Sequence, residues 1–137
     1  MNEILAKQLA IDFCTDVNSI LSKENVFTEY KQLEGRRIFK EGECYFKAAS
    51  VNGKIVASGR KDIIQWAREK FKTENGAWFM DMGCLHELEE GLLKFQCRIG
   101  QAHPFYIATE KSDVDTKDYD IKIFIGDELL SLIHISE

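Results

Sequence analysis

The feature that most constrains the fold of this 137-residue chain is a hairpin signal in residues 46–59, FKAASVNGKIVASG. Two short, mostly apolar runs flank the dipeptide Asn52-Gly53. Asn-Gly readily takes positive φ at both central positions, which is the backbone that a two-residue type I′ turn requires. The sequence therefore predicts two antiparallel strands with a fixed register. The predicted cross-strand pairs are Val51 with Lys54, Ser50 with Ile55, Ala49 with Val56, and Ala48 with Ala57.

Both sides of this predicted hairpin are apolar. Val56 and Ala49 point to one side, and the opposite side carries Ile55, Phe46, Ala48 and Ala57. A sheet with one face in water would show a polar side, so we expect this sheet to be covered on both faces. The two small alanines indicate that something large packs close to the second side.

Apolar residues recur with helical spacing in four segments around the hairpin. The expected helices are residues 2–13, a short helix capped by Thr15 or Asp16, residues 60–72 ended by Asn75-Gly76, and residues 84–97. The expected strands beyond the hairpin are an extended segment 26–39 broken at Gly35, a buried strand 77–82, and strands 105–108 and 119–125.

This order predicts an α+β fold with a mixed or antiparallel sheet, a central hairpin and helices packed on it. We expect one domain over residues 1–110, an acidic linker over 111–118, and the start of a second domain over 119–137.

Two packing expectations follow from the middle of the chain. Gly91 lies inside the last predicted helix, where glycine costs about 1 kcal/mol relative to alanine, so close packing is expected there. The aromatic residues of this region are expected to share one core in which both tryptophans are at least half buried: Phe46, Trp66, Phe71 and Trp78.

Composition excludes several classes of protein. The chain is 45% hydrophobic and 30% charged, which is typical of a globular domain and not of a disordered tail. No apolar run approaches the ~20 residues of a membrane span, and the N-terminus has no signal-peptide pattern. The four cysteines form no CxxC pair, so we expect reduced thiols in a cytoplasmic protein. A net charge of −5 without a nucleic-acid motif argues against nucleic-acid binding.

Charge is unevenly distributed, and one segment is basic. Residues 36–72 contain ten lysines and arginines against four acidic residues. Such a run can face an anionic ligand such as a phosphate, although a solvated surface is the interpretation we favour. Glu29 and Glu34, close in sequence to Arg36 and Arg37, are candidates for a substrate-amine site. Surface ion pairs on an edge strand are the favoured alternative for these charges.

Histidine and cysteine supply two weaker candidates. His103 and Tyr106 could form an acid–base pair that contacts substrate, but a histidine before a proline more often caps a backbone carbonyl. No common zinc site has the spacing of Cys84, His86, Cys97 and His103. We therefore favour buried thiols and a surface histidine. No base can be placed beside any of the four thiols.

Several segments together resemble the N-terminal half of two-domain GNAT-family N-acetyltransferases of Firmicutes. The segments are LAIDFC (9–14), NVFTEYKQLEGRRIF (25–39), FKAASVNGKIVASGRKDIIQW (46–66), AWFMD (77–81) and AHPFYIAT (102–109). The resemblance implies a GNAT-like or GNAT-associated fold and, for the full-length family, acetyl-CoA as cofactor and a small amine as acceptor.

The loop that holds the acetyl-CoA pyrophosphate is usually R/Q-x-x-G-x-G/A, and this chain has no match to it. The resemblance places that loop in a C-terminal catalytic domain, of which YDIKIFIGDELL resembles the entry. Residues 131–137, SLIHISE, resemble translated sequencing adapter, so we expect a truncated reading frame of metagenomic origin. No catalytic residue carries over.

Two functions follow from the sequence. The first is a non-catalytic N-terminal half of an N-acetyltransferase, which would bind no acetyl-CoA by itself and whose partner is the missing catalytic domain. The alternative is a free-standing binding module for a small anion or a protein. The candidate substrate-binding residues are Glu29, Arg36, Arg37, His103 and Tyr106.

Overall fold

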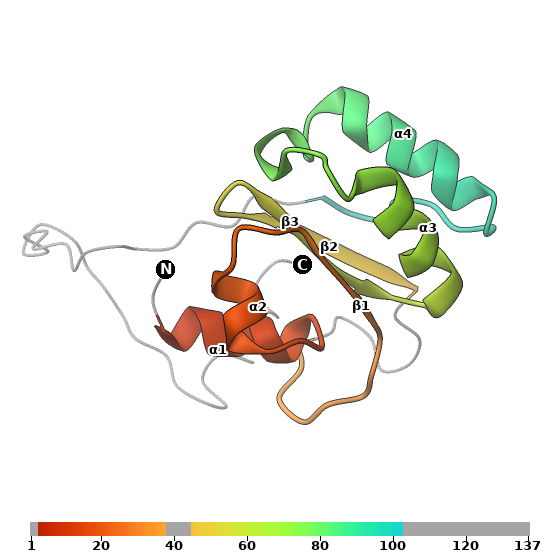
Figure 1. The fold of residues 1–137 in the computed structure, drawn as a ribbon. Helices are drawn as coiled ribbons and strands as arrows, with labels where there is room; N and C mark the ends of the chain where they lie inside the picture. Colours follow the sequence, from red (N-terminus) through yellow and green to blue (C-terminus); the bar gives the residue numbers. More distant parts are fainter. Residues whose placement is uncertain (1–2, 38–44, 103–137) are drawn as a thin grey trace, which may run out of the picture. The chain divides into compact units, whose positions relative to one another are not determined.

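The structure, a computed structural model, describes residues 3–37 and 45–102, which form one compact unit (Figure 1). The predicted strands 105–108 and 119–125, the linker and the second domain lie outside these residues. In chain order the elements are α1 (Glu3–Asp12), α2 (Val17–Leu21), β1 (Val26–Glu29), β2 (Phe46–Val51), β3 (Lys54–Gly59), α3 (Lys61–Phe71), the 3₁₀ helix η1 (Gly76–Trp78) and α4 (Met82–Leu93). The fold is α+β, as predicted.

A three-stranded mixed sheet lies between the helices, in the order β1-β3-β2. The β2–β3 hairpin has the predicted register, including Ala49 opposite Val56 and Val51 opposite Lys54. Its turn has φ of 51° at Asn52 and 75° at Gly53, so the type I′ prediction is confirmed. β1 pairs with β3 in parallel and forms one edge of the sheet.

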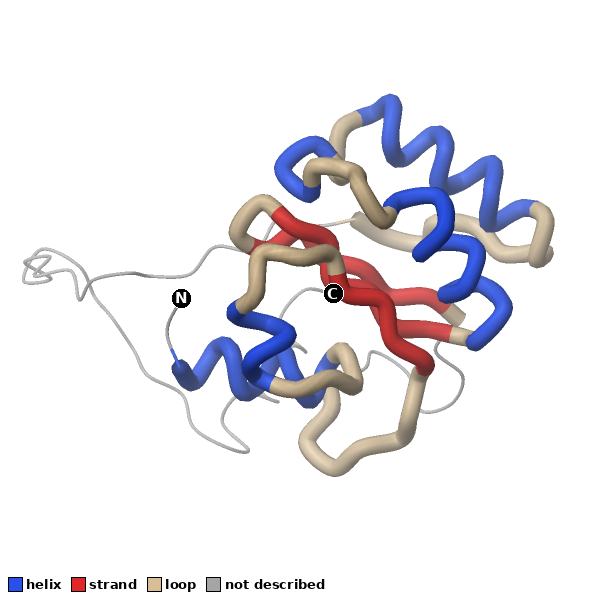
Figure 2. Tube along the Cα trace, viewed as in Figure 1, coloured by secondary structure: helices blue, strands red, loops and turns tan. Residues whose placement is uncertain are grey.

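Helices cover both faces of this sheet, as the apolar hairpin predicts (Figure 2). Every residue of β3 is buried. Alternation along this strand divides the core, because Val56 packs with α1 and α2 while Ile55 and Ala57 pack with α3 and α4. Phe46 and Ala48 lie on the second side and Ala49 on the first, which confirms both predicted faces.

Side chains of Asp16 and Lys54 hold the two ends of α2. α2 begins after Asp16, whose side chain accepts a hydrogen bond from the Ser19 backbone N–H, so Asp16 is the cap. The end of α2 is held by Lys54, which is only 2% exposed and whose Nζ donates to the Ser19 carbonyl oxygen. Burial lowers the pKa of Lys54, but its charge lies at the C-terminal end of a helix, where a cation is favoured.

Helix α3 presents the predicted inner face, because Ile63, Ile64, Ala67 and Phe71 are all buried. It spans Lys61–Phe71, within one residue of the predicted 60–72 at each end. The Asn25 amide donates to three carbonyl oxygens at the C-terminal end of the helix, those of Phe71, Lys72 and Glu74. Asn25 therefore holds the end of α3, and the prediction that Asn75-Gly76 ends this helix is wrong.

The predicted buried strand 77–82 is also wrong. Asn75 accepts a hydrogen bond from Ala77 and opens η1, and successive i→i+3 bonds carry the turn to Asp81. Only Phe79 of this segment turns into the core, while Trp78 is 65% exposed, so the prediction of a buried Trp78 fails. Gly76 is required here, since a Cβ would lie 2.2–2.6 Å from the Lys54 backbone.

The predicted close packing at Gly91 is confirmed. A Cβ at this position would lie 1.8 Å from Cζ2 of Trp66, so the indole ring rests directly on the helix backbone. Trp66 also contacts Phe71 edge-on and Phe95 at a tilt, with ring centroids 5.9 Å apart in both pairs. None of the helices within residues 3–37 and 45–102 is long and apolar enough to cross a membrane.

Candidate anion site at the end of the first helix

Asp12, the last residue of α1, is the centre of a polar cluster inside the protein. It is 1% exposed and follows the buried residues Leu9 and Ala10 on the inner side of the helix. Its carboxylate accepts hydrogen bonds from the side chain of Gln8, from the backbone N–H of Arg37 and from the guanidinium of Arg37. The two Arg37 bonds measure 2.8 Å, and the pair also forms a salt bridge.

The pKa of the Asp12 carboxyl lies below its usual value of 3.8. Burial alone would raise this pKa, but the hydrogen bonds from Arg37 and Gln8 and the charge of Lys47 outweigh burial. Because the folded pKa is the lower one, the unfolded chain binds more protons in acid. The stability that Asp12 contributes is therefore present above about pH 4 and lost as pH falls through the folded pKa.

Asp12→Asn tests this linkage. We expect the variant to lose about 1 kcal/mol at neutral pH, since Arg37 is largely exposed and solvent screens the pair. We also expect a shallower decline of stability between pH 4 and 2 than in the wild type. Urea unfolding at a series of pH values measures both effects, and parallel acid profiles for the two proteins would refute the assignment.

Arg36 is the most unusual residue of the cluster. It follows a turn at Gly35, where φ is +76°, and it is only 8% exposed. Its Nε donates to the Asp12 carbonyl oxygen at 3.0 Å, and its guanidinium lies 4.2 Å from the ring centre of Tyr30. Both terminal nitrogens, NH1 and NH2, are buried and have no hydrogen-bond partner in the part of the chain that the structure describes. Buried guanidinium nitrogens are normally paired, so this edge of Arg36 lacks its acceptor.

The cluster also gathers positive charge. Lys47 on β2 donates from Nζ to the Arg37 carbonyl oxygen at 3.0 Å. Among the described charged residues that these bonds join, Arg36, Arg37 and Lys47 are cations and Asp12 is the anion. Arg37 is already paired with Asp12. Within the described residues, donors therefore remain at the edge of Arg36 that NH1 and NH2 form.

Of the other predicted site residues, Arg37 shares Asp12 with Arg36, whereas Glu29 does not join this cluster. Glu29 lies exposed at the end of β1 and lines a shallow hollow with Lys61 and Arg68. The ion pair of Arg37 is with Asp12 and not with Glu29 or Glu34, the partners that the sequence suggested. His103 and Tyr106 lie outside the described residues.

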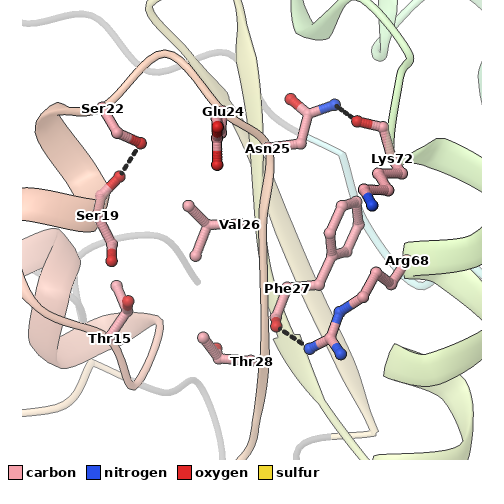
Figure 3. A pocket seen from close by; sticks show the side chains of 10 residues that line it. All are labelled: Thr15, Ser19, Ser22, Glu24, Asn25, Val26, Phe27, Thr28, Arg68 and Lys72. Atoms are coloured by element: carbon pink, nitrogen blue, oxygen red, sulfur yellow. Dashed lines mark hydrogen bonds between the residues drawn. The ribbon is translucent and has the colours of Figure 1, made fainter.

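A second hollow of about 320 Å³ runs along the edge strand β1, between α2 and α3 (Figure 3). Several of its polar groups already have partners within the fold. Arg68 donates to the Phe27 carbonyl oxygen at 2.7 Å, and Ser22 donates to the Ser19 carbonyl oxygen. The Arg68 bond ties the edge strand to α3, which is a structural role.

Acetyl-CoA, which the family resemblance implies, does not fit the described residues. Its pyrophosphate needs a helix N-terminus with free backbone N–H groups and no negative charge. Asp16 caps α2, Asp62 lies in the first turn of α3, and Asp81 is at the cap position of α4. The starts of α2 and α4 therefore carry carboxylates that would repel the pyrophosphate, and Asp62 at the start of α3 is engaged with Arg60.

Sequence reasoning named Arg36 but missed Asp12 and Tyr30. The available signal for Asp12 was its place between Leu9 and Phe13 on the apolar side of a helix, where an acid needs a partner. Comparisons of the chain with protein-family models, with curated proteins and with solved structures found no match.

Proposed function

We propose that this chain is a binding module for a small anionic group, which is held by the guanidinium of Arg36. The observation that carries the proposal is the buried edge of Arg36, whose NH1 and NH2 have no hydrogen-bond partner among the described residues. Removing an ion from water costs several kcal/mol unless an opposite charge and hydrogen bonds compensate it. An anion that accepts from both nitrogens would supply both.

The surroundings of Arg36 prepare it for such a ligand. The bond from Nε to Asp12 and the stacking on Tyr30 fix the plane of the guanidinium before any ligand arrives. A donor fork that is already oriented loses less conformational entropy on binding. The resulting site is a rigid recognition element.

The resemblance to GNAT-family N-acetyltransferases suggests a larger protein in which this module would act. In that setting the chain is the non-catalytic N-terminal half, acetyl-CoA is bound by the catalytic half, and Arg36 holds an anionic group of the amine acceptor. A free-standing anion-binding module is the alternative. A complete gene that continues into an R/Q-x-x-G-x-G/A loop favours the first.

The proposal is tested by thermal unfolding of the full chain while small anions are added at constant ionic strength. We expect at least one of acetate, phosphate and sulfate to raise the midpoint of the wild type in a saturable way. Arg36→Met should abolish that rise. Arg60→Met is the matched control, because Arg60 also lies near a tyrosine ring and binds an aspartate but is exposed. No rise in the wild type, or an equal rise in Arg36→Met, would overturn the proposal.

A separate prediction concerns the cofactor. We expect titration calorimetry of this chain with acetyl-CoA to give no binding in the micromolar range, because the three helix starts named above carry carboxylates. Micromolar or tighter binding would show that a pyrophosphate site exists in this chain.

A further inference from the structure

We infer that the ligand of Arg36 presents a carboxylate group and not a phosphate or sulfate. The inference rests on the proposed function above and specifies the chemical class of the ligand. In an acetyltransferase setting, the acceptor would be an amine that also carries a carboxylate.

The first argument is the supply of hydrogen-bond donors around Arg36. Its backbone N–H donates to the Leu33 carbonyl oxygen at 3.3 Å, and its Nε donates to Asp12. The backbone N–H and Nε of Arg37 donate to the Asp12 carboxylate. The N–H groups of NH1 and NH2 therefore remain, and one N–H of each nitrogen lies side by side with the other on the outer edge of the guanidinium.

The second argument matches these donors to oxygen atoms. A carboxylate has two oxygens, and both can accept from the parallel N–H groups of one guanidinium edge. A phosphate or sulfate would bring further oxygens into a site where NH1 and NH2 are closed to solvent. The backbone N–H groups of Arg36 and Arg37 are engaged, so those oxygens could not accept from them, and an oxygen without a donor is costly in a buried site.

The third argument concerns shape. Tyr30 stacks at 4.2 Å and occupies one face of the guanidinium, and its hydroxyl donates to the Gln32 side chain. The ligand must therefore approach in the plane of the guanidinium, as a flat carboxylate does.

The experiment follows the side-chain NMR signals of Arg36 in the full chain, assigned by their absence in Arg36→Lys. Acetate, inorganic phosphate and acetamide are added separately at constant ionic strength, in a buffer free of other carboxylates and phosphate. Acetamide matches acetate in shape but carries no charge. We expect acetate to shift the Arg36 signals saturably and acetamide to leave them in place. Phosphate should bind about tenfold more weakly than acetate, or worse.

The outcomes distinguish a failure of the carboxylate inference from a failure of the anion-binding function. Tighter binding of phosphate than of acetate at Arg36 would overturn the carboxylate inference and leave the anion-binding function standing. Equal effects of acetate and acetamide would also overturn it, since charge would then have no role. If none of the three probes moves the Arg36 signals, the proposed function itself fails.

Discussion

Replacing Phe71 with alanine is expected to lower the free energy of unfolding by about 3–5 kcal/mol, the usual cost of deleting a buried aromatic side chain. Phe71 is 1% exposed and ends the inner face of α3. Its ring contacts Trp66 and Phe79 edge-on, with centroids 5.9 Å and 5.5 Å away. The substitution therefore removes a ring from the centre of the core between the sheet and the helices α3 and α4. A movement of one neighbouring side chain cannot fill the resulting cavity.

Trp78→Ala is the matched control for this prediction. Trp78 lies in the adjacent η1 segment and is larger than Phe71, but it is 65% exposed. Its replacement should cost less than about 1 kcal/mol, since surface changes are usually small. Urea unfolding of both variants makes the comparison. A smaller loss for Phe71→Ala than for Trp78→Ala would reverse the assignment of core and surface in this region.

Gly91→Ala is expected to destabilise the protein by about 2–3 kcal/mol, toward the upper end of overpacking costs. The sign is the informative part, because the same change inside an exposed helix stabilises by about 1 kcal/mol. At Gly91 the new methyl group would lie 1.8 Å from Cζ2 and 2.1 Å from Cη2 of Trp66. The indole must then leave its place against Phe71 and Phe95.

Two further variants isolate the cause. Gly83 lies in the first turn of the same helix, and a Cβ there would meet nothing closer than 4.0 Å, so Gly83→Ala should be neutral or stabilising. In a double-mutant cycle, Trp66→Phe should reduce the penalty of Gly91→Ala, since a smaller ring leaves room. Additive effects of the two substitutions would show that Trp66 is not the obstacle.

The hairpin shows what local sequence can predict. Asn52-Gly53 determines the turn, the turn determines the register, and strict alternation then assigns Val56 and Ile55 to opposite faces. Each step depends on residues a few positions apart, and each is confirmed.

Residues 77–82 show where that reasoning fails. An apolar run of this length is compatible with a strand or a turn, and apolarity predicted a strand. The cap at Asn75 and the close approach of Gly76 to the Lys54 backbone decide the conformation instead. The second of these is a tertiary contact, which no local pattern reveals.

The candidate site could be predicted only in part. Arg36 was named for its charge, and its suggested partners were the acids nearest in sequence. In the structure the neighbouring Arg37 pairs with Asp12, which is 25 residues away in the sequence and belongs to helix α1. Pairings of this kind depend on how α1 packs beneath the sheet. The missing acceptor at NH1 and NH2, which carries the proposal, is visible only once burial is known.

The central claim is that the buried charge of Arg36 has no anionic partner among residues 3–37 and 45–102, and urea unfolding of Arg36→Met tests it most directly. The measurement is made at neutral pH in a low-salt zwitterionic buffer without carboxylates or phosphate. Removing a buried, unpaired charge is favourable, but the substitution also removes the Nε bond to the Asp12 carbonyl oxygen and the stacking on Tyr30. The net loss should therefore stay below about 2 kcal/mol. A loss of about 3–5 kcal/mol, the range for breaking a buried ion pair, would contradict the account, because the guanidinium would then already have its partner in the protein.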